Sequence, residues 1–117
     1  MIKGIGLDII EIERIEKAMA RTNRFKQRIL SDRELEIFST YSPSRKVEFL
    51  AGRFAAKEAF SKALGTGIGS ACRLHDIEIL RGDVGKPVLY FKGEQVNGFV
   101  SITHTKQYAA AQVLLMM

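Results

Sequence analysis

The sequence has little of what disulfide-bonded, zinc-stabilised or membrane proteins depend on. Its 117 residues include one cysteine, two histidines and no tryptophan. The single Cys72 excludes a disulfide within the chain and is typical of a reducing cytoplasm. One cysteine and two histidines are too few for a usual structural zinc site. No apolar run approaches the roughly 20 residues of a membrane helix, and the N-terminus lacks a signal-peptide pattern. We therefore expect a soluble cytoplasmic protein.

Length and charge limit the number of domains and the kind of partner. A chain of 117 residues predicts a single domain over residues 1–117, and such a chain buries only about two-thirds of its unfolded surface. A large two-sided pocket is therefore hard to enclose within one subunit. The net charge of +5 favours an anionic partner, which can be nucleic acid, an acidic protein or a phosphorylated cofactor.

The first half of the sequence predicts one strand followed by helices. Residues 2–10 alternate like a strand, and helical spacing begins near residue 11. A capping box, Ser-Asp-Arg-Glu, opens a helix over residues 31–39. Ser-Pro opens a long helix over residues 42–64, and Gly65 stands where that helix should end.

The second half predicts antiparallel strands. Residues 76–80 and 88–91 flank a turn at residues 83–87, which indicates a hairpin. Residues 98–105 and 108–115 form a second strand pair. Helices first and strands later indicate an α+β fold, in which an antiparallel sheet packs against the long helix.

The end of the long helix carries the most informative residues. Glu58 and Lys62 lie four apart and share one helical face. The glycine-rich loop 65–69 follows, with backbone N–H groups that we expect to be free. A carboxylate can hold a divalent cation, while an amine and amides can hold phosphate. The loop follows a helix C-terminus, where the dipole opposes an anion, so it is not a P-loop. A plain glycine cap beside a solvated lysine is the alternative.

Asp8 is the candidate second carboxylate. It ends a strand face on which Gly4 and Gly6 leave no side chains, and such glycines mark close approach of a ligand or of another backbone. Magnesium prefers one or two protein carboxylates with water and substrate phosphates. Asp8 and Glu58 therefore form a candidate magnesium pair; two ordinary solvated acids are the alternative.

Two further features are less specific. His104 shares a strand face with Ile102, which in isolation favours a buried core histidine over a proton acceptor or phosphate ligand. Basic residues follow helical spacing near the N-terminus, although Thr22-Asn23 is a possible helix break. Only Phe25 accompanies them as an exposed aromatic, which favours an acidic protein over nucleic acid as partner. These basic residues are Arg14, Lys17, Arg21, Arg24 and Arg28.

Several motifs together resemble the holo-acyl-carrier-protein synthases of the 4′-phosphopantetheinyl transferase superfamily. The resemblance spans the whole chain, and its motifs are specific as a set. They are residues 4–9 (GIGLDI) with Arg14, residues 54–59 (FAAKEA) with Lys62 and residues 65–67 (GTG), residues 85–87 (GKP), and residues 101–105 (SITHT) with residues 108–111 (YAAA).

The resemblance implies transfer of 4′-phosphopantetheine from coenzyme A to a serine of acyl carrier protein, which serves fatty acid biosynthesis. Adenosine 3′,5′-bisphosphate is the other product. It implies Mg²⁺ held by Asp8 and Glu58, and a homotrimer with active sites at subunit interfaces. For the proton acceptor, Glu58 or a metal-bound water is favoured over His104. The implied contacts are Lys62, Gly65, Thr66, Gly67, His104 and Thr105 to coenzyme A, and Arg14, Arg21 and Arg24 to an acidic carrier protein.

Two other functions remain open from the sequence. A small nucleic-acid-binding module would use the basic residues as its main surface and ignore the two carboxylates. Another magnesium-dependent phosphotransferase or pyrophosphohydrolase would use the same carboxylates on a different substrate. Salt-sensitive nucleic-acid binding would distinguish the first, and substrate trials the second.

Overall fold

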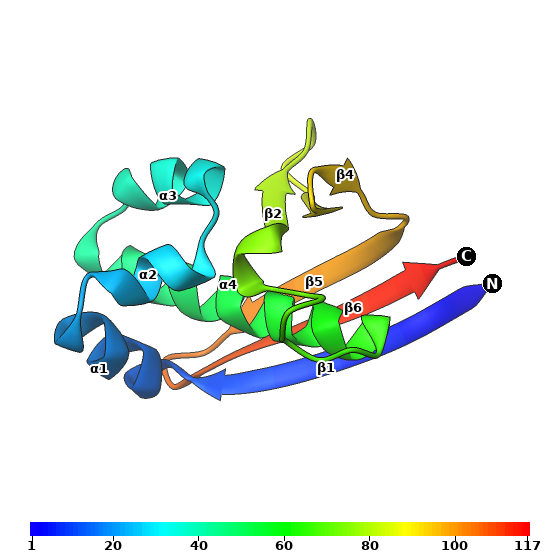
Figure 1. The fold of residues 1–117 in the computed structure, drawn as a ribbon. Coiled ribbons are helices and arrows are strands. Elements are labelled where there is room, and N and C mark those ends of the chain that lie inside the picture. The colour runs from blue at the N-terminus through cyan, green and yellow to red at the C-terminus, as the bar shows by residue number, and fades with distance from the viewer.

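The computed structural model describes residues 1–117 and has an α+β fold built around one long helix (Figure 1). Helix α4 (Pro43–Leu64) lies across a three-stranded antiparallel sheet. That sheet has the order β1-β6-β5, with β1 at Ile2–Glu11, β6 at Tyr108–Met116 and β5 at Gly98–His104. The predicted fold class, with an antiparallel sheet against a long helix, is confirmed.

The second half of the chain forms a separate small sheet. Strands β2 (Ile77–Arg81), β3 (Pro87–Phe91) and β4 (Glu94–Gln95) pair in that order, after the short helix η1 (Leu74–Asp76). The predicted hairpin is present as β2 and β3. The structure therefore has two sheets rather than one, because β3 contacts β5 without forming a hydrogen-bonded ladder with it. No helix of the structure combines the length and the apolar character needed to cross a membrane.

Three short helices cover one end of α4 and form the helical cap (residues 12–39). They are α1 (Ile12–Arg21), α2 (Arg24–Ile29) and α3 (Asp32–Ser39). Thr22 is extended, with φ −159° and ψ 142°, so the first helix ends where the sequence suggested a break. The short helix α2 was not predicted. The cap packs on α4 through an apolar cluster that includes Ile15, Leu30 and Phe49.

Local signals set the helix ends as expected. The Ser31 hydroxyl accepts from the Glu34 amide, and the Glu34 side chain accepts from the Ser31 amide, which completes the capping box. The Ser42 hydroxyl accepts from the amide of Arg45 at the start of α4. Gly65 ends α4 in the left-handed conformation, with φ 92°, which glycine adopts without a steric penalty.

Gly4 and Gly6 let α4 lie directly on β1. A Cβ atom at Gly4 would overlap the carbonyl oxygen of Ala63, and one at Gly6 would overlap the carbonyl oxygen of Ala59. The close approach predicted for this face is thus to another backbone, not to a ligand. It brings Asp8, which continues the same face of β1, to the flank of α4.

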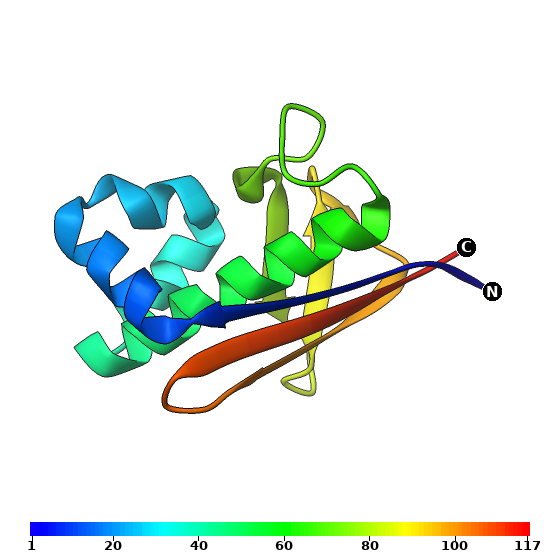
Figure 2. The same cartoon turned by 90° about the horizontal axis from the view of Figure 1, so that it is seen from below.

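The opposite face of the large sheet is uncovered and carries large apolar side chains beside the polar Ser101, Thr103 and Gln112. Ile5, Leu7 and Ile9 point away from α4 and are 59%, 62% and 65% exposed, and Phe99 of β5 is 52% exposed. The ribbon shows no helix on this side of the sheet (Figures 1 and 2). The sheet therefore packs its glycine and alanine face inward and leaves large aliphatic side chains in water.

Candidate active site

Asp8 and Glu58 lie at the same pocket, which we call the acid pocket. It is a cavity of about 290 Å³ between β1, α4 and the helical cap. Asp8 comes from β1 and Glu58 from the C-terminal third of α4, while the other walls are mostly apolar. The lining residues are Asp8, Ile9, Ile10, Arg14, Ile15, Ala18, Phe25, Phe54 and Glu58.

The two carboxylates influence each other electrostatically. Burial raises the pKa of Glu58 above its ordinary value, the negative charge of Asp8 raises it further, and Lys62 opposes the shift. Two mutually repelling carboxylates with oxygen donors fit a hard dication such as Mg²⁺. No group of three or more His, Cys, Asp or Glu residues is placed to hold a metal. A cation on Asp8 and Glu58 would thus take its remaining ligands from water and substrate.

Lys62 lies one helical turn beyond Glu58 and pairs with Asp8. Its Nζ is 3.1 Å from Asp8 Oδ1 and donates to the Leu7 carbonyl oxygen at 3.0 Å. About half of the Lys62 side chain is exposed, so this ion pair adds little to stability. The structure therefore brings together the three charged residues predicted from the sequence, with an amine free to turn toward a phosphate.

The glycine loop after α4 differs from the expectation of free amides. The Gly65 amide donates to the carbonyl oxygens of Ser61 and Lys62, and the Gly67 amide also donates to Ser61. These amides cap the end of α4, whose last carbonyl groups otherwise lack partners. Only the Thr66 and Ile68 amides of this loop make no backbone hydrogen bond. The prediction of free amides is therefore wrong for Gly65 and Gly67, and also for Gly69, whose amide donates to the Cys72 carbonyl oxygen.

The side-chain hydroxyl of the loop is hydrogen-bonded as well. The Thr66 hydroxyl donates to the Gly67 carbonyl oxygen at 2.8 Å. A phosphate bound here would rely on the Thr66 and Ile68 amides and on Lys62, because glycine supplies no side chain. The roles assigned to Gly65, Thr66 and Gly67 in binding coenzyme A stay predictions.

His104 lies on the other flank of α4, in a second cavity of about 250 Å³ that we call the basic pocket. Its side chain is 40% exposed and its Nε2 is 3.5 Å from Glu48 Oε2, so the interpretation as a buried core histidine is wrong. His104 therefore lines a different cavity from the one that Asp8 and Glu58 line. The lining residues of the basic pocket are Arg45, Glu48, Phe49, Gly52, Arg53, Arg81, Gly85, Pro87, Ile102 and His104.

Sequence reasoning did not single out the three arginines of the basic pocket. Burial lowers the pKa of Arg53, its guanidinium lies 4.3 Å from the Phe49 ring centre, and its Nε is buried without a hydrogen-bond partner. Such an unsatisfied buried donor favours an anionic ligand. The available signal was the eight-residue spacing of Arg45 and Arg53, which places both on one face of a helix.

Thr105 and the basic residues of the cap occupy different surroundings. The Thr105 hydroxyl accepts from the amides of Gln107 and Tyr108 and so closes the turn between β5 and β6.

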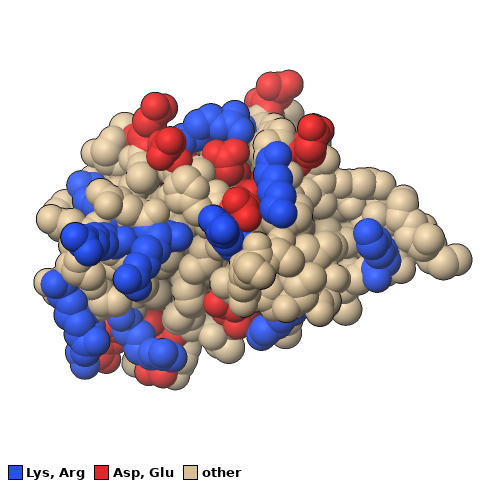
Figure 3. Space-filling view, in the orientation of Figure 1, with Lys and Arg blue, Asp and Glu red and all other residues tan.

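Arg14 lines the acid pocket, whereas Arg21 ends α1 and Arg24 begins α2. Lysine and arginine side chains gather over the helical cap at the left of Figure 3. The break at Thr22 divides them between two helices, so they do not form one continuous helical stripe.

Comparisons with known proteins agree with this geometry. The model of the 4′-phosphopantetheinyl transferase superfamily matches residues 4–113. A holo-[acyl-carrier-protein] synthase of Bacillus subtilis is 56% identical over 98% of this chain and 96% of its own length. A crystal structure of the Bacillus anthracis synthase, in complex with CoA (3′,5′-ADP), has a TM-score of 0.86 at 49% identity and covers 98% of this chain and 96% of that one.

A more distant solved relative has the same fold. The Helicobacter pylori synthase, in complex with coenzyme A, has a TM-score of 0.82 at 33% identity and covers 96% of this chain and 99% of that one. Fold and sequence thus define a phosphopantetheinyl transferase. The chain belongs to the holo-[acyl-carrier-protein] synthases of the 4′-phosphopantetheinyl transferase superfamily.

Proposed function

We propose that this chain transfers 4′-phosphopantetheine from coenzyme A to a serine of apo acyl carrier protein in the cytoplasm, with Mg²⁺ held by Asp8 and Glu58. Its family establishes the transferase class, the donor and the acceptor. The observation that supports the metal is the meeting of two distant carboxylates at one pocket. When bound, Mg²⁺ would neutralise charge on the diphosphate as its phosphoanhydride bond breaks.

The chain's own residues can supply the other parts of the reaction. The serine oxygen attacks the phosphorus that carries pantetheine, and adenosine 3′,5′-bisphosphate leaves with the electrons of the broken P–O bond. Glu58, whose pKa is raised by burial and by the negative charge of Asp8, takes the serine proton. Lys62 turns from Asp8 to the diphosphate, where its positive charge stabilises the developing negative charge.

A homotrimer would join the two pockets that one chain keeps apart. The uncovered apolar face of the large sheet, with Ile5, Leu7, Ile9 and Phe99, is the kind of surface that a second copy covers. The basic pocket of one subunit, with His104, would then complete the acid pocket of the next. A monomeric mass in sedimentation analysis at micromolar concentration would contradict this arrangement.

The activity is tested by mass spectrometry of the carrier protein. Incubation of this protein with apo acyl carrier protein, coenzyme A and Mg²⁺ is expected to add one phosphopantetheine group to the carrier. EDTA should prevent the adduct, and excess Mg²⁺ should restore it. Transfer that persists in EDTA would refute the metal role of Asp8 and Glu58. Breakdown of coenzyme A without an adduct would instead indicate a pyrophosphohydrolase.

Charge reversal in the cap tests the carrier-protein surface. Arg14→Glu and Arg21→Glu are expected to raise KM for the acidic carrier protein at least about tenfold, because rim charges govern encounter and orientation. KM for coenzyme A should stay within about twofold in the same assays, since charge acts locally when salt screens it. Lys3→Glu, at the far end of β1, serves as a matched control. Equal weakening for both substrates would contradict the assignment.

A further inference from the structure

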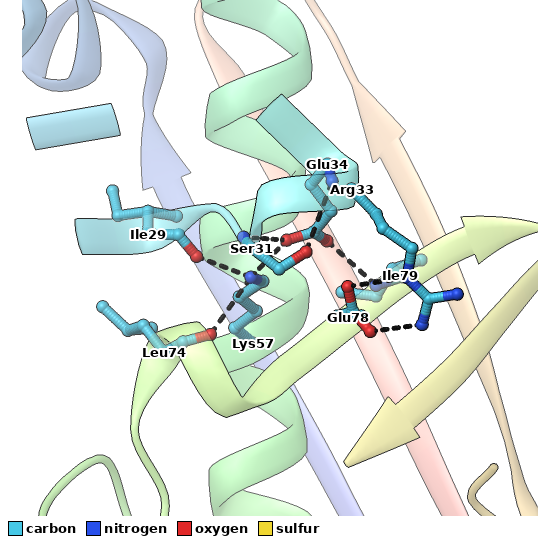
Figure 4. Close-up of polar contacts among 8 residues, drawn as sticks. All are labelled: Ile29, Ser31, Arg33, Glu34, Lys57, Leu74, Glu78 and Ile79. Atoms are coloured by element: carbon cyan, nitrogen blue, oxygen red, sulfur yellow. Dashed lines mark hydrogen bonds and ion pairs between the residues drawn. The ribbon is translucent and has the colours of Figure 1, made fainter. Parts of the chain in front are cut away.

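Lys57, the residue before Glu58, is buried with all three of its ammonium hydrogens matched to acceptors. Its Nζ donates to Glu34 Oε1 at 2.6 Å, to the Ile29 carbonyl oxygen at 2.5 Å and to the Leu74 carbonyl oxygen at 3.1 Å (Figure 4). The side chain is 0% exposed. A lysine is almost never fully buried unless it is paired, so this arrangement needs an explanation.

Glu34 completes the network from the other side. Its Oε1 accepts from the Ser31 amide at 3.0 Å as well as from Lys57, and its Oε2 accepts from the Ile79 amide at 2.9 Å. Both charges are therefore compensated and hydrogen-bonded. Removing one partner of such a pair leaves an uncompensated buried charge and is strongly destabilising.

The network joins the helical cap to the rest of the chain at one point. Ile29 ends α2 and Glu34 lies in α3, while Lys57 belongs to α4, Leu74 to η1 and Ile79 to β2. The only other long-range side-chain hydrogen bonds from the cap join Arg33 to Glu78, at the surface, and at the start of α1 the Ile12 amide donates to the carbonyl oxygen of the exposed Gln107. The buried directional contacts of the cap thus all pass through Lys57 and Glu34.

The cap in turn forms one wall of the acid pocket. Arg14 and Ile15 of α1 and Phe25 of α2 line that pocket opposite Glu58. The hydrophobic effect is non-directional, whereas the hydrogen bonds of a buried ion pair are directional and in some proteins specify one arrangement. The distance from the cap wall to Glu58 therefore depends on how the pair holds α2 and α3 against α4.

We propose that Lys57 and Glu34 are positioning residues that fix the helical cap against α4 and so set the carrier-protein side of the acid pocket. The proposal rests on the proposed function for the identity of the substrate. Lys62, expected to contact the donor, is positioned by β1 through Leu7 and Asp8 and not by this network. Loss of the network should accordingly impair carrier-protein binding more than coenzyme A binding.

The test compares Glu34→Gln and Lys57→Met with Glu78→Gln, which breaks the surface pair between the same two elements, α3 and β2. Circular dichroism first identifies a temperature at which each variant is folded. Steady-state assays with carrier protein and coenzyme A then give KM and kcat, and hydrogen–deuterium exchange reports the cap amides. If Lys57→Met fails to fold, Glu34→Gln alone carries the test, because it keeps the side-chain shape.

We expect both buried variants to raise KM for carrier protein about tenfold and to leave KM for coenzyme A within about twofold. Unequal changes of the two KM values distinguish a positioning role from general destabilisation of the protein. Amides of residues 12–29 should exchange faster, while those in the middle of α4 should not. Glu78→Gln should change neither measurement. Equal rises in both KM values, or unchanged exchange in the cap, would overturn the proposal. An inactive wild type would refute the proposed function instead, and exchange would still decide whether the pair fixes the cap.

Discussion

Glu58→Gln is expected to lower kcat/KM for transfer about a thousandfold or more while the protein stays folded. The amide keeps the shape of the side chain but removes the charge of the carboxylate, which is the proposed metal ligand and the proposed proton acceptor. Loss of one electrostatic group that acts in the transition state typically costs about 10²–10³ in rate, and two roles are proposed for Glu58. Transfer to carrier protein, followed by mass spectrometry, measures the effect.

The pH dependence supplies an independent check on Glu58. On acidification protons compete with Mg²⁺ for Glu58, whose pKa in metal-free protein is raised by burial and by Asp8, so the wild-type rate should decline. The residual rate of Glu58→Gln should lack that decline. In metal-free protein, the folded state binds this proton more tightly than the unfolded state. The wild type should therefore gain stability relative to Glu58→Gln as the pH falls through the raised pKa.

A matched carboxylate on the surface controls for nonspecific loss of charge. Glu36→Gln removes an exposed acid from α3 and should leave the rate within about twofold, because surface substitutions away from a site have small effects. Retained magnesium-dependent turnover in Glu58→Gln would remove Glu58 from the metal site. A large loss in both variants would show that overall charge, not position, governs the reaction.

Gly6→Ala is expected to reduce both stability and activity. The new Cβ would overlap the Ala59 carbonyl oxygen, which belongs to the backbone of α4 and cannot turn aside. Either β1 or the helix must move, at a cost of about 3 kcal/mol in the free energy of unfolding. That change should lower Tm by about 10 °C. The same movement separates Asp8 from Glu58, so turnover should fall even at temperatures where the variant is folded.

Gly69→Ala is the matched control for this substitution. An added Cβ at Gly69 meets no atom within 4 Å, and its φ lies outside the left-handed region. Its stability should therefore change by no more than about 0.5 kcal/mol. Thermal unfolding followed by circular dichroism compares the two variants. Equal Tm values for Gly6→Ala and the wild type would show that β1 and α4 are not as closely packed as described.

Much of the fold was predictable because its signals are local. The capping box at Ser31 and Glu34, the Ser42-Pro43 start of α4 and the left-handed Gly65 each act within a few residues. The α4 register likewise placed Glu58 and Lys62 on one side, and Lys62 indeed reaches Asp8. For the same reason, the break at Thr22 was visible in advance.

The features that sequence reasoning missed depend on tertiary contacts. Glu34 looks like an ordinary capping residue, and nothing local shows that its carboxylate is buried against Lys57 from a helix 23 positions later. The three arginines of the basic pocket come together only when β2 packs near α4. The amides of Gly65 and Gly67 turn inward because α4 needs them, a requirement that composition does not reveal.

The exposed aliphatic side chains of β1 affect the stability of the chain and its tendency to aggregate. Ile5, Leu7 and Ile9 contribute only part of their possible burial energy to an isolated folded subunit, since they stay 59%, 62% and 65% exposed after folding. If further copies of this chain cover them, Tm should rise with protein concentration. Until it assembles, a newly synthesised chain would expose these apolar side chains to water. Rapid assembly would then reduce aggregation.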